Sequence, residues 1–184
     1  MSSPRYALVA YVQGPVKDFV ENLRQELHPE LPHLAAHLTV LPPRVLYGSE
    51  THAVEVLEEI CQHQEPFDVD LGEVETFIPV TPTVFIRVGH ARALLDLHQR
   101  LNATSALCCA EEWEYLPHLT IAKMSTEAQA QQAYLAARHR WGQFAGSRCI
   151  HVKELTFVRE ADSNRWVDLA GVPLGQSLVS GPRR

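Results

Sequence analysis

Two four-residue stretches, HLTV at residues 37–40 and HLTI at residues 118–121, share a histidine and a threonine separated by one apolar residue. Successive side chains of a β-strand point to opposite faces. In extended conformation, each stretch would therefore place its histidine and threonine on one face and its apolar residues on the other. The chain would then present two imidazoles and two hydroxyls from two half-buried strands, a combination that suits acid–base chemistry on an anion.

The order of predicted elements around these motifs occurs twice. A β-forming run at 5–12 (RYALVAYV), a helix and the first motif are followed by a run at 83–88 (TVFIRV), another helix and the second motif. The strands begin 78 residues apart and the motif histidines lie 81 residues apart. Side-chain identity between the halves is weak, so the repeat concerns element order. We expect one domain over residues 1–174, built from two equivalent lobes that meet at a cleft, and a C-terminal tail at 175–184.

The rest of the chain has the signals of an α+β protein. Gly14-Pro15 and Pro29 bracket the first helix, and Pro42-Pro43 is expected to end the first motif strand. Ser49 and Thr126 are predicted to cap two later helices. Further strands are expected at residues 66–80, with a bend or bulge at Gly72, and at residues 148–159 and 165–170, as a hairpin.

Composition narrows the class of protein. At 184 residues, with 46% apolar and 21% charged residues, the chain can bury a core without disulfides or metals. Its net charge of −6 argues against tight binding to DNA or long RNA, which requires a basic face. A single nucleotide or the end of an RNA strand remains compatible with this charge.

Cysteine and histidine spacing gives no sign of a metal site. The four cysteines form no C-x-x-C pair, and the histidines show no spacing typical of metal ligands. The N-terminus has neither a signal sequence nor a run long enough to span a membrane. We therefore expect a monomeric cytoplasmic protein that uses no metal, cofactor or membrane.

The two motifs could act together on a strained cyclic phosphodiester. Water must lose a proton to attack phosphorus, and the departing ribose oxygen must gain one. His37 and His118, one neutral and one protonated, could carry out both transfers near neutral pH. Thr39 and Thr120 could donate hydrogen bonds to the non-bridging phosphate oxygens, where charge develops. The sequence does not indicate which histidine is the base.

On these motifs the chain resembles the two-histidine (2H) phosphoesterase superfamily, and within it the 2′-5′ RNA ligase-like and cyclic phosphodiesterase branch. The matching segments are HLTVLPP at 37–43 and PHLTIAK at 117–123, and the order of elements fits from residue 5 to about 174. The resemblance implies a bilobal, duplicated α+β fold with two antiparallel sheets lining a central cleft and helices packed outside. It also implies metal-independent hydrolysis of 2′,3′-cyclic phosphates, often with a 2′-phosphate as product.

Members of this superfamily differ in substrate. Some act on ADP-ribose 1″,2″-cyclic phosphate, some on 2′-5′ or 3′ ends of oligonucleotides, and some catalyse reversible 2′-5′ ligation. In this chain Pro42-Pro43 replaces the glycine-containing turn that many ligase-like members have after the first motif. Together with the acidic charge, this departure favours a small cyclic nucleotide or an RNA 3′ end as substrate.

Several other residues are candidates for substrate binding. Arg44 and Lys123 each follow a motif threonine and could offset phosphate charge, although regular alternation would turn Lys123 away from His118. A solvated surface position suits Lys123 equally well and is the favoured interpretation for Arg44. Tyr115 could stack on a base, but packing against the loop or the core is the favoured interpretation. Tyr11 and Phe85, in the equivalent first strands of the two halves, are expected to be core residues.

Three functions remain open from the sequence. The first is a cyclic phosphodiesterase that opens a 2′,3′-cyclic phosphate on a nucleotide or an RNA terminus. The second uses the same residues as a 2′-5′ RNA ligase or on ADP-ribose 1″,2″-cyclic phosphate. The third is a non-catalytic nucleotide- or RNA-binding module, which would not need a matched proton donor and acceptor.

Overall fold

The computed structural model describes residues 3–27, 34–109, 111–162 and 165–175. These parts of the chain contain four helices and eight strands in the order β1 (Tyr6–Tyr11), α1 (Gly14–Leu27), β2 (His37–Arg44), α2 (Glu50–Cys61), β3 (Phe67–Thr76), β4 (Thr83–Val88), α3 (Arg92–Asn102), β5 (His118–Lys123), α4 (Glu127–Gly142), β6 (Cys149–Val152), β7 (Glu154–Asp162) and β8 (Arg165–Pro173). The fold is therefore α+β, as the sequence predicts. Pro29, expected to end the first helix, and the tail beyond residue 175 lie outside the described residues.

All strand pairs are antiparallel, and the strand order is β6-β3-β4-β5-β2-β1-β7-β8. Two four-stranded halves can be recognised in this order, β6-β3-β4-β5 and β2-β1-β7-β8. Each half carries one motif strand at its inner edge, and the two motif strands pair with one another. This is the duplicated arrangement that the repeat predicts, with the two expected sheets continuous through β2 and β5.

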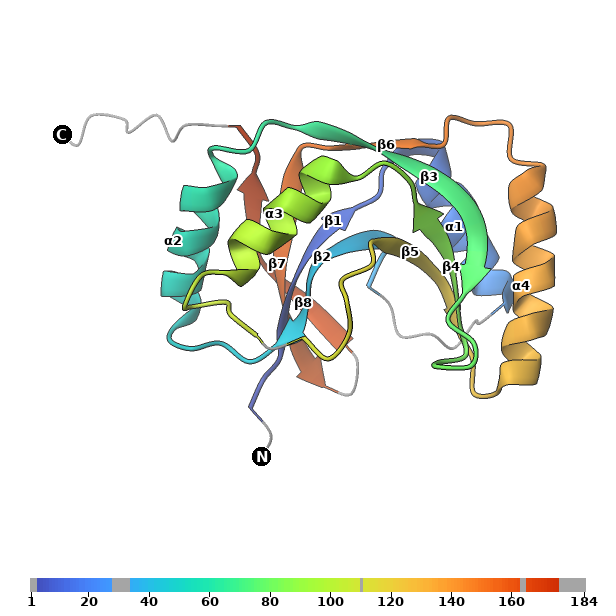
Figure 1. Ribbon diagram of the computed structural model, residues 1–184, viewed down its shortest axis with the longest axis horizontal. Coiled ribbons are helices and arrows are strands. Elements are labelled where there is room, and N and C mark those ends of the chain that lie inside the picture. Colours follow the sequence, from blue (N-terminus) through green and yellow to red (C-terminus); the bar gives the residue numbers. More distant parts are fainter. Residues whose placement is uncertain (1–2, 28–33, 110, 163–164, 176–184) are drawn as a thin grey trace.

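The sheet is strongly curled. A single residue, Lys153, separates β6 from β7, although β6 is the outer strand of one half and β7 belongs to the other. One extended residue spans only about 3.5 Å, so the two halves must approach one another at this point. Figure 1 shows the resulting arch, with β2 and β5 at its centre.

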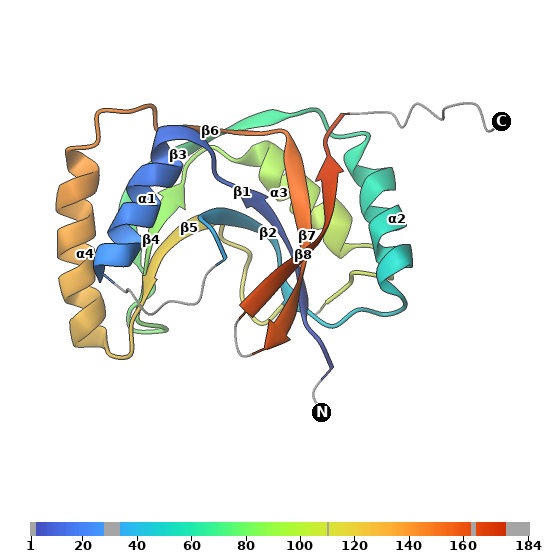
Figure 2. The ribbon, with the colours of Figure 1, turned by 180° about the vertical axis from the view of Figure 1, so that it is seen from behind.

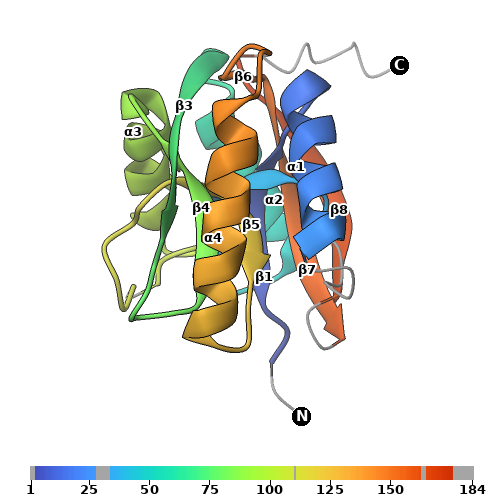
Figure 3. The same cartoon turned by 90° about the vertical axis from the view of Figure 1, so that its right-hand side faces the viewer.

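The helices lie in two pairs at the two ends of the sheet, α1 beside α4 and α2 beside α3 (Figures 1 and 2). Phe19 of α1 packs against Trp141 of α4 with ring centroids 5.4 Å apart, and Figure 3 shows these two helices next to one another. Buried residues of all four helices share one hydrophobic cluster with Leu38 and Leu119. The helices therefore cover the face of the sheet that carries the apolar motif residues. None of them, within the described residues, is long and apolar enough to cross a membrane.

Several local predictions are confirmed. The Ser49 side chain accepts a hydrogen bond from the backbone N–H of His52 at the start of α2 (3.1 Å). Thr126 caps α4 in the same way through Gln129 N–H (3.2 Å). The register between β3 and β4 shifts by one residue around Gly72, which is the predicted bulge.

Two predicted strand boundaries are wrong. The first motif strand does not end at Pro42-Pro43 but continues to Arg44. It is paired on that stretch with β1 alone, because β5 begins at His118, and a register shift against β1 accommodates the prolines. On the edge of β2 that has no partner strand there, the N–H that a proline lacks would have made no ladder hydrogen bond. The expected strand at 148–159 is also divided, since β6 pairs with β3 and β7 pairs with β1 and β8.

Candidate active site

The two motif strands meet at the centre of the sheet, where Leu38 of β2 lies opposite Leu119 of β5. In an antiparallel pair, this register places the histidine of each motif across from the threonine of the other. The two histidines are then diagonal neighbours, a relation in which Cβ atoms lie about 7 Å apart. That spacing leaves room for one phosphoryl group with an imidazole on either side of it.

The polar motif residues share one face of the sheet, which we call the histidine face: the surface that carries His37, Thr39, His118 and Thr120. All four are half-buried. The apolar motif residues point the other way and are fully buried in the core under the helices: Leu38, Val40, Leu119 and Ile121. The alternation predicted from the sequence is therefore present in both strands.

Each histidine ring is held by the same contact. Nδ1 of His37 lies 2.7 Å from the backbone oxygen of Ala35, and Nδ1 of His118 lies 2.7 Å from that of Leu116. A carbonyl oxygen only accepts, so Nδ1 carries the hydrogen in both rings. This leaves Nε2 as the nitrogen that takes or gives a proton. The repeated backbone thus imposes one tautomer on both imidazoles.

The backbone in front of each motif is also held in the same way. The N–H of Val12, the residue after β1, donates to the oxygen of Ala36 (2.9 Å). The N–H of Val88, at the end of β4, donates to the oxygen of Pro117 (3.3 Å). The residue that precedes each motif histidine is therefore hydrogen-bonded to the last residue of the neighbouring strand, or to the residue after it, in its own half.

Burial lowers the pKa of both histidines. The pKa of His37 falls to about 4, mainly through desolvation and further through the positive charges of Arg24, Lys123 and a protonated His118. The pKa of His118 is lowered by desolvation and by Lys123. The hydrogen bond to the backbone carbonyl opposes the shift in each case. Without a bound anion, both rings are neutral at pH 7.

The walls beside the two histidines differ. Phe77 and Phe85 stack with ring centroids 4.1 Å apart, and His118 meets both rings edge-on at 5.0 and 5.2 Å. Phe85 is buried, as expected, but its side chain packs on the histidine face and not in the main core. One aromatic wall therefore fixes the orientation of His118.

On the other side, Tyr11 of β1 lies opposite His37 in the register. Its hydroxyl donates to Oδ1 of Asp168 on β8 (2.6 Å). Tyr11 belongs to a small cluster with Val9 and Val158, separate from the main core in which it was expected. The side chain beside His37 is thus Tyr11, whose hydroxyl is bonded to the Asp168 carboxylate.

The turn before His37 is fixed from α1. Buried Arg24 donates to the backbone oxygen of Leu34 (3.1 Å) and pairs with Glu21 (3.3 Å). The Glu21 carboxylate also accepts a hydrogen bond from the N–H of Ala36. One ion pair therefore holds both sides of the turn whose middle carbonyl orients the His37 ring.

Lys123 lies on the histidine face, in contrast to the prediction from regular alternation. The ladder between β4 and β5 shifts by one residue after Thr120, so that Ile121 and Ala122 are both buried. The alternation resumes one position later, with Lys123 opposite Thr83. Its charge lowers the pKa of both histidines, as expected for a cation on the same face.

A sequence model of the 2′-5′ RNA ligase superfamily matches residues 12–164. The chain belongs to this superfamily. A protein named "putative phosphoesterase" from Oceanobacillus iheyensis is 30% identical over 121 residues, which cover 65% of this chain and 70% of that protein. A relative of the same name from Halalkalibacterium halodurans is 29% identical over 117 residues, covering 63% and 68% of the two chains.

Solved structures of other proteins share the fold. E. coli LigT, crystallised with 3′-AMP, superposes with a TM-score of 0.60 at 16% identity, covering 95% of this chain and 100% of that chain. The TT0787 protein of Thermus thermophilus gives a TM-score of 0.63 at 15% identity, covering 93% and 98%. The duplicated, curled α+β architecture is thus common to proteins with little sequence identity.

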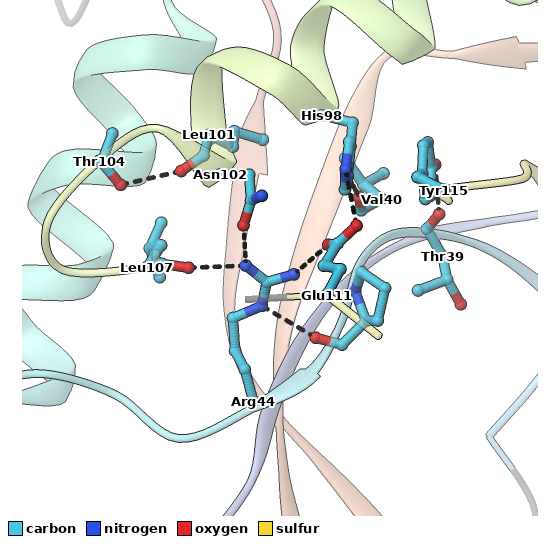
Figure 4. A network of polar contacts seen from close by, with 11 residues as sticks. Thr39, Val40, Arg44, His98, Leu101, Asn102, Thr104, Leu107, Glu111 and Tyr115 are labelled. Atoms are coloured by element: carbon cyan, nitrogen blue, oxygen red, sulfur yellow. Dashed lines mark hydrogen bonds and ion pairs between the residues drawn. The ribbon is translucent and has the colours of Figure 1, made fainter. Parts of the chain in front are cut away.

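Arg44, a predicted substrate-binding residue, is directed away from the histidine face. Its side chain is buried and donates to Asn102 Oδ1 (2.6 Å) and to the backbone oxygen of Leu107 (2.6 Å), as Figure 4 shows. It also pairs with Glu111 at 2.9 Å and donates to the backbone oxygen of Pro42. Each nitrogen of the Arg44 guanidinium group therefore donates to an acceptor of the protein itself. The structure therefore gives Arg44 a role in holding the loop before β5 and not in contacting a ligand.

Tyr115 also joins this network. Its hydroxyl donates to the backbone oxygen of Thr39 (2.6 Å), and its ring stacks on buried His98 at a centroid distance of 3.7 Å (Figure 4). His98 in turn contacts the Val40 oxygen (2.8 Å) and Glu111 (3.3 Å). Tyr115 thus packs against the protein, as the sequence analysis favours, and it connects the segment before the second motif to β2, the strand of the first motif.

One exposed residue of the histidine face was not among the predicted site residues. Arg87 of β4 lies directly opposite His118 and is paired with Glu75 of β3 (3.4 Å). The strand TVFIRV places Arg87 two residues from Phe85, and hence on the same face. The register that brings it beside His118 could not be read from the sequence.

Among the described residues, no cluster of three or more metal-ligating side chains occurs.

Proposed function

We propose that this protein hydrolyses 2′,3′-cyclic phosphates on a nucleotide or an RNA end, with His37 and His118 as the proton-transfer pair. The observation that carries the proposal is the arrangement of the two rings. Both are tied through Nδ1 to a backbone carbonyl, both offer Nε2 on one face, and they occupy diagonal positions across one strand pair. Membership of the superfamily and the phosphoesterase names of the relatives support the same class of reaction.

The reaction needs one proton taken and one proton given. Nε2 of one histidine accepts a proton from water as its oxygen bonds to phosphorus, and Nε2 of the other gives a proton to the ribose oxygen as its bond to phosphorus breaks. Attack and departure occur on opposite sides of phosphorus. Diagonal histidines on either side of the phosphoryl group match this requirement.

The threonines stabilise the charge that develops between the histidines. Each motif threonine lies across from the other motif's histidine, so a phosphate held between the rings has a hydroxyl on both of its remaining sides. Hydroxyl donors fixed before the reaction stabilise the transition state more than the ground state. Lys123, on the same face, adds a positive charge close to both histidines.

The surroundings of the two rings favour an assignment of their roles. His37 is the more readily neutral ring, because burial and the charges of Arg24 and Lys123 hold its pKa at about 4. A neutral imidazole is the form that accepts a proton, so we assign His37 as the general base and His118 as the general acid. A bound phosphate anion raises the pKa of both rings and keeps one proton in the pair at neutral pH.

The experiment uses the purified protein with a panel of 2′,3′-cyclic nucleotides in excess chelator, with products identified by phosphorus NMR. We expect hydrolysis to a phosphomonoester at an undiminished rate. Replacing either histidine, His37→Ala or His118→Ala, should reduce kcat by about 10²–10⁴-fold, the range for lost acid–base catalysis. His63→Ala, at an exposed position after α2, is the matched control.

Other outcomes reject parts of the proposal. Activity that disappears in chelator and returns only with added metal would exclude the two-histidine mechanism. Hydrolysis of ADP-ribose 1″,2″-cyclic phosphate alone, or joining of RNA ends without hydrolysis, would assign the site to another branch of the superfamily. Nucleotide binding that persists in both histidine variants without turnover in the wild type would indicate a binding module.

A further inference from the structure

The two halves of the histidine face differ most at one pair of equivalent positions. Tyr11 lies opposite His37, and Arg87 lies opposite His118, in matching registers of the two halves. The Tyr11 hydroxyl is bonded to the Asp168 carboxylate, whereas Arg87 carries a positive charge and its side chain is 58% exposed. The fold is duplicated here, but the charge beside the reaction centre is not.

Among the described residues, only the His118 side offers an exposed arginine to an anion that extends from the histidines, because Arg24 near His37 is buried and paired with Glu21. A phosphate on the His37 side would approach the Asp168 carboxylate, which repels it. A phosphate on the His118 side meets Arg87, whose planar group of donors suits phosphate oxygens. The partner of Arg87 in the structure, Glu75, is 41% exposed and lies 3.4 Å away. An exposed ion pair of this kind is weak, so a phosphate can replace the carboxylate.

The surface next to Arg87 is hollowed. An open groove of about 440 Å³ is lined by Gly72, Glu73, Glu75, Arg87, Val88, Gly89 and His90. It lies at the β3 bulge, where the register against β4 shifts between Leu71 and Val74, and beyond the first residue of β5. The Glu73 and Glu75 carboxylates of the groove are hydrogen-bond acceptors of the kind that ribose hydroxyls and base amino groups require, and Glu73 also pairs with Arg148 at 3.7 Å. A nucleotide carries such donors, and a free phosphate ion does not.

We propose that Arg87 binds a second phosphate of the substrate, on the 5′ side of the nucleotide that carries the cyclic phosphate, and that the groove receives the group beyond it. The inference rests on the proposed function and narrows it. The preferred substrate is a cyclic phosphate with a second phosphate attached, as at an RNA 3′ end, and not a nucleoside 2′,3′-cyclic phosphate alone. Arg87 is then a specificity residue for this second phosphate.

The test compares two substrates that differ by one phosphate. Adenosine 2′,3′-cyclic phosphate and its 5′-phosphorylated form are assayed separately with the wild type, and the ratio of their kcat/KM values is measured. We expect a ratio of roughly ten or more in favour of the 5′-phosphorylated form, which is the size of effect for a charge-assisted hydrogen bond. Arg87→Gln should bring the ratio close to one, and most of the change should be in KM.

Two further variants sharpen the result. Glu75→Gln removes the carboxylate that competes with the phosphate, so the ratio should rise above that of the wild type. Arg92→Gln, an exposed arginine of α3 paired with Asp96, is the matched control and should keep the wild-type ratio. A dinucleotide that ends in a cyclic phosphate and ADP-ribose 1″,2″-cyclic phosphate both contain a second phosphate. Their relative kcat/KM values distinguish an RNA end from an ADP-ribose derivative.

Equal kcat/KM for the two adenosine substrates, or an Arg87→Gln variant that slows both equally, overturns the inference. Binding separates this failure from failure of the proposed function. Calorimetric titration with adenosine 2′,5′-bisphosphate and with 2′-AMP reports the same contact without turnover. Tighter binding of the bisphosphate that is lost in Arg87→Gln supports the second-phosphate site even if no cyclic phosphate is hydrolysed. Equal binding of the two ligands rejects it.

Discussion

The His37 half and the His118 half of the molecule share a backbone but not an environment. In both, a motif strand at the inner edge presents a histidine whose Nδ1 donates to the carbonyl two residues earlier. In one half the neighbouring wall is Tyr11 bonded to Asp168, and in the other it is the Phe77–Phe85 stack with Arg87. The repeat therefore fixes the position and tautomer of the two histidines, while side chains that are not repeated set their pKa values and, in our proposal, the direction of the substrate.

The end of the first motif strand shows another difference between the halves. Arg44 is buried and bonded to Asn102, Leu107 and Glu111, in a network that reaches the loop before β5. The position equivalent to Arg44 in the second half falls after the end of β5, at exposed Ser125. Arg44 of the first half thus holds the loop that leads to His118 of the second half.

The largest effect on stability is expected from Arg44→Ala. Removing one partner of a buried, hydrogen-bonded ion pair typically lowers the free energy of unfolding by about 3–5 kcal/mol. Denaturant unfolding measures this loss, and Arg92→Ala, at an exposed ion pair, should change the stability by less than about 1 kcal/mol. A substrate-binding role would give the opposite pattern, with a raised KM and nearly unchanged stability.

The next prediction compares the two threonines. Thr39→Val and Thr120→Val each remove one hydroxyl donor while keeping the β-branched shape of the side chain. Each should lower kcat by about 10²-fold or more with little change in KM, because the bond strengthens in the transition state. Single-turnover rates with a cyclic nucleotide provide the measurement. If one variant loses activity and the other does not, the phosphate lies closer to one motif and the two halves do not share its stabilisation.

The sequence was sufficient for the elements of the site but not for their pairing. Alternation in HLTV and HLTI correctly predicted which side chains would be buried, since strand periodicity is a local property. The register that opposes Leu38 and Leu119 depends on contacts across the sheet, which no local pattern reports. For the same reason Arg87 was not predicted as a site residue, because its position beside His118 depends on the register between β4 and β5.

Two further differences from the predictions have identifiable structural causes. Lys123 reaches the histidine face because β5 contains one residue more than its partner strand requires, and a bulge reverses all alternation beyond it. Arg44 turned out to be buried because Asn102 and Glu111, both distant in sequence, satisfy its guanidinium. A charged residue after a motif is normally exposed, so only the tertiary partners of Arg44 explain its burial.

The smallest effect, and the one that tests the comparison most directly, is expected in the pH profile of kcat/KM. With His37 as base, activity falls as the pH drops through its pKa of about 4, because the ring becomes protonated. With His118 as acid, activity falls as the pH rises through its pKa, which burial places below 6.5. The optimum for the free enzyme should therefore lie on the acidic side of pH 6.5.

Variants of Lys123 and Arg24 distinguish the acidic limb of the pH profile from the basic limb. Lys123 lowers the pKa of both histidines, so Lys123→Gln should move both limbs to higher pH. Arg24 acts on His37 alone, so Arg24→Met should move the acidic limb upward and leave the basic limb in place, in the fraction that remains folded. Lys153→Gln, at the exposed link between β6 and β7, should move neither limb. If Arg24→Met moves the basic limb instead, the roles of the two histidines are exchanged, and the half with the aromatic wall supplies the base.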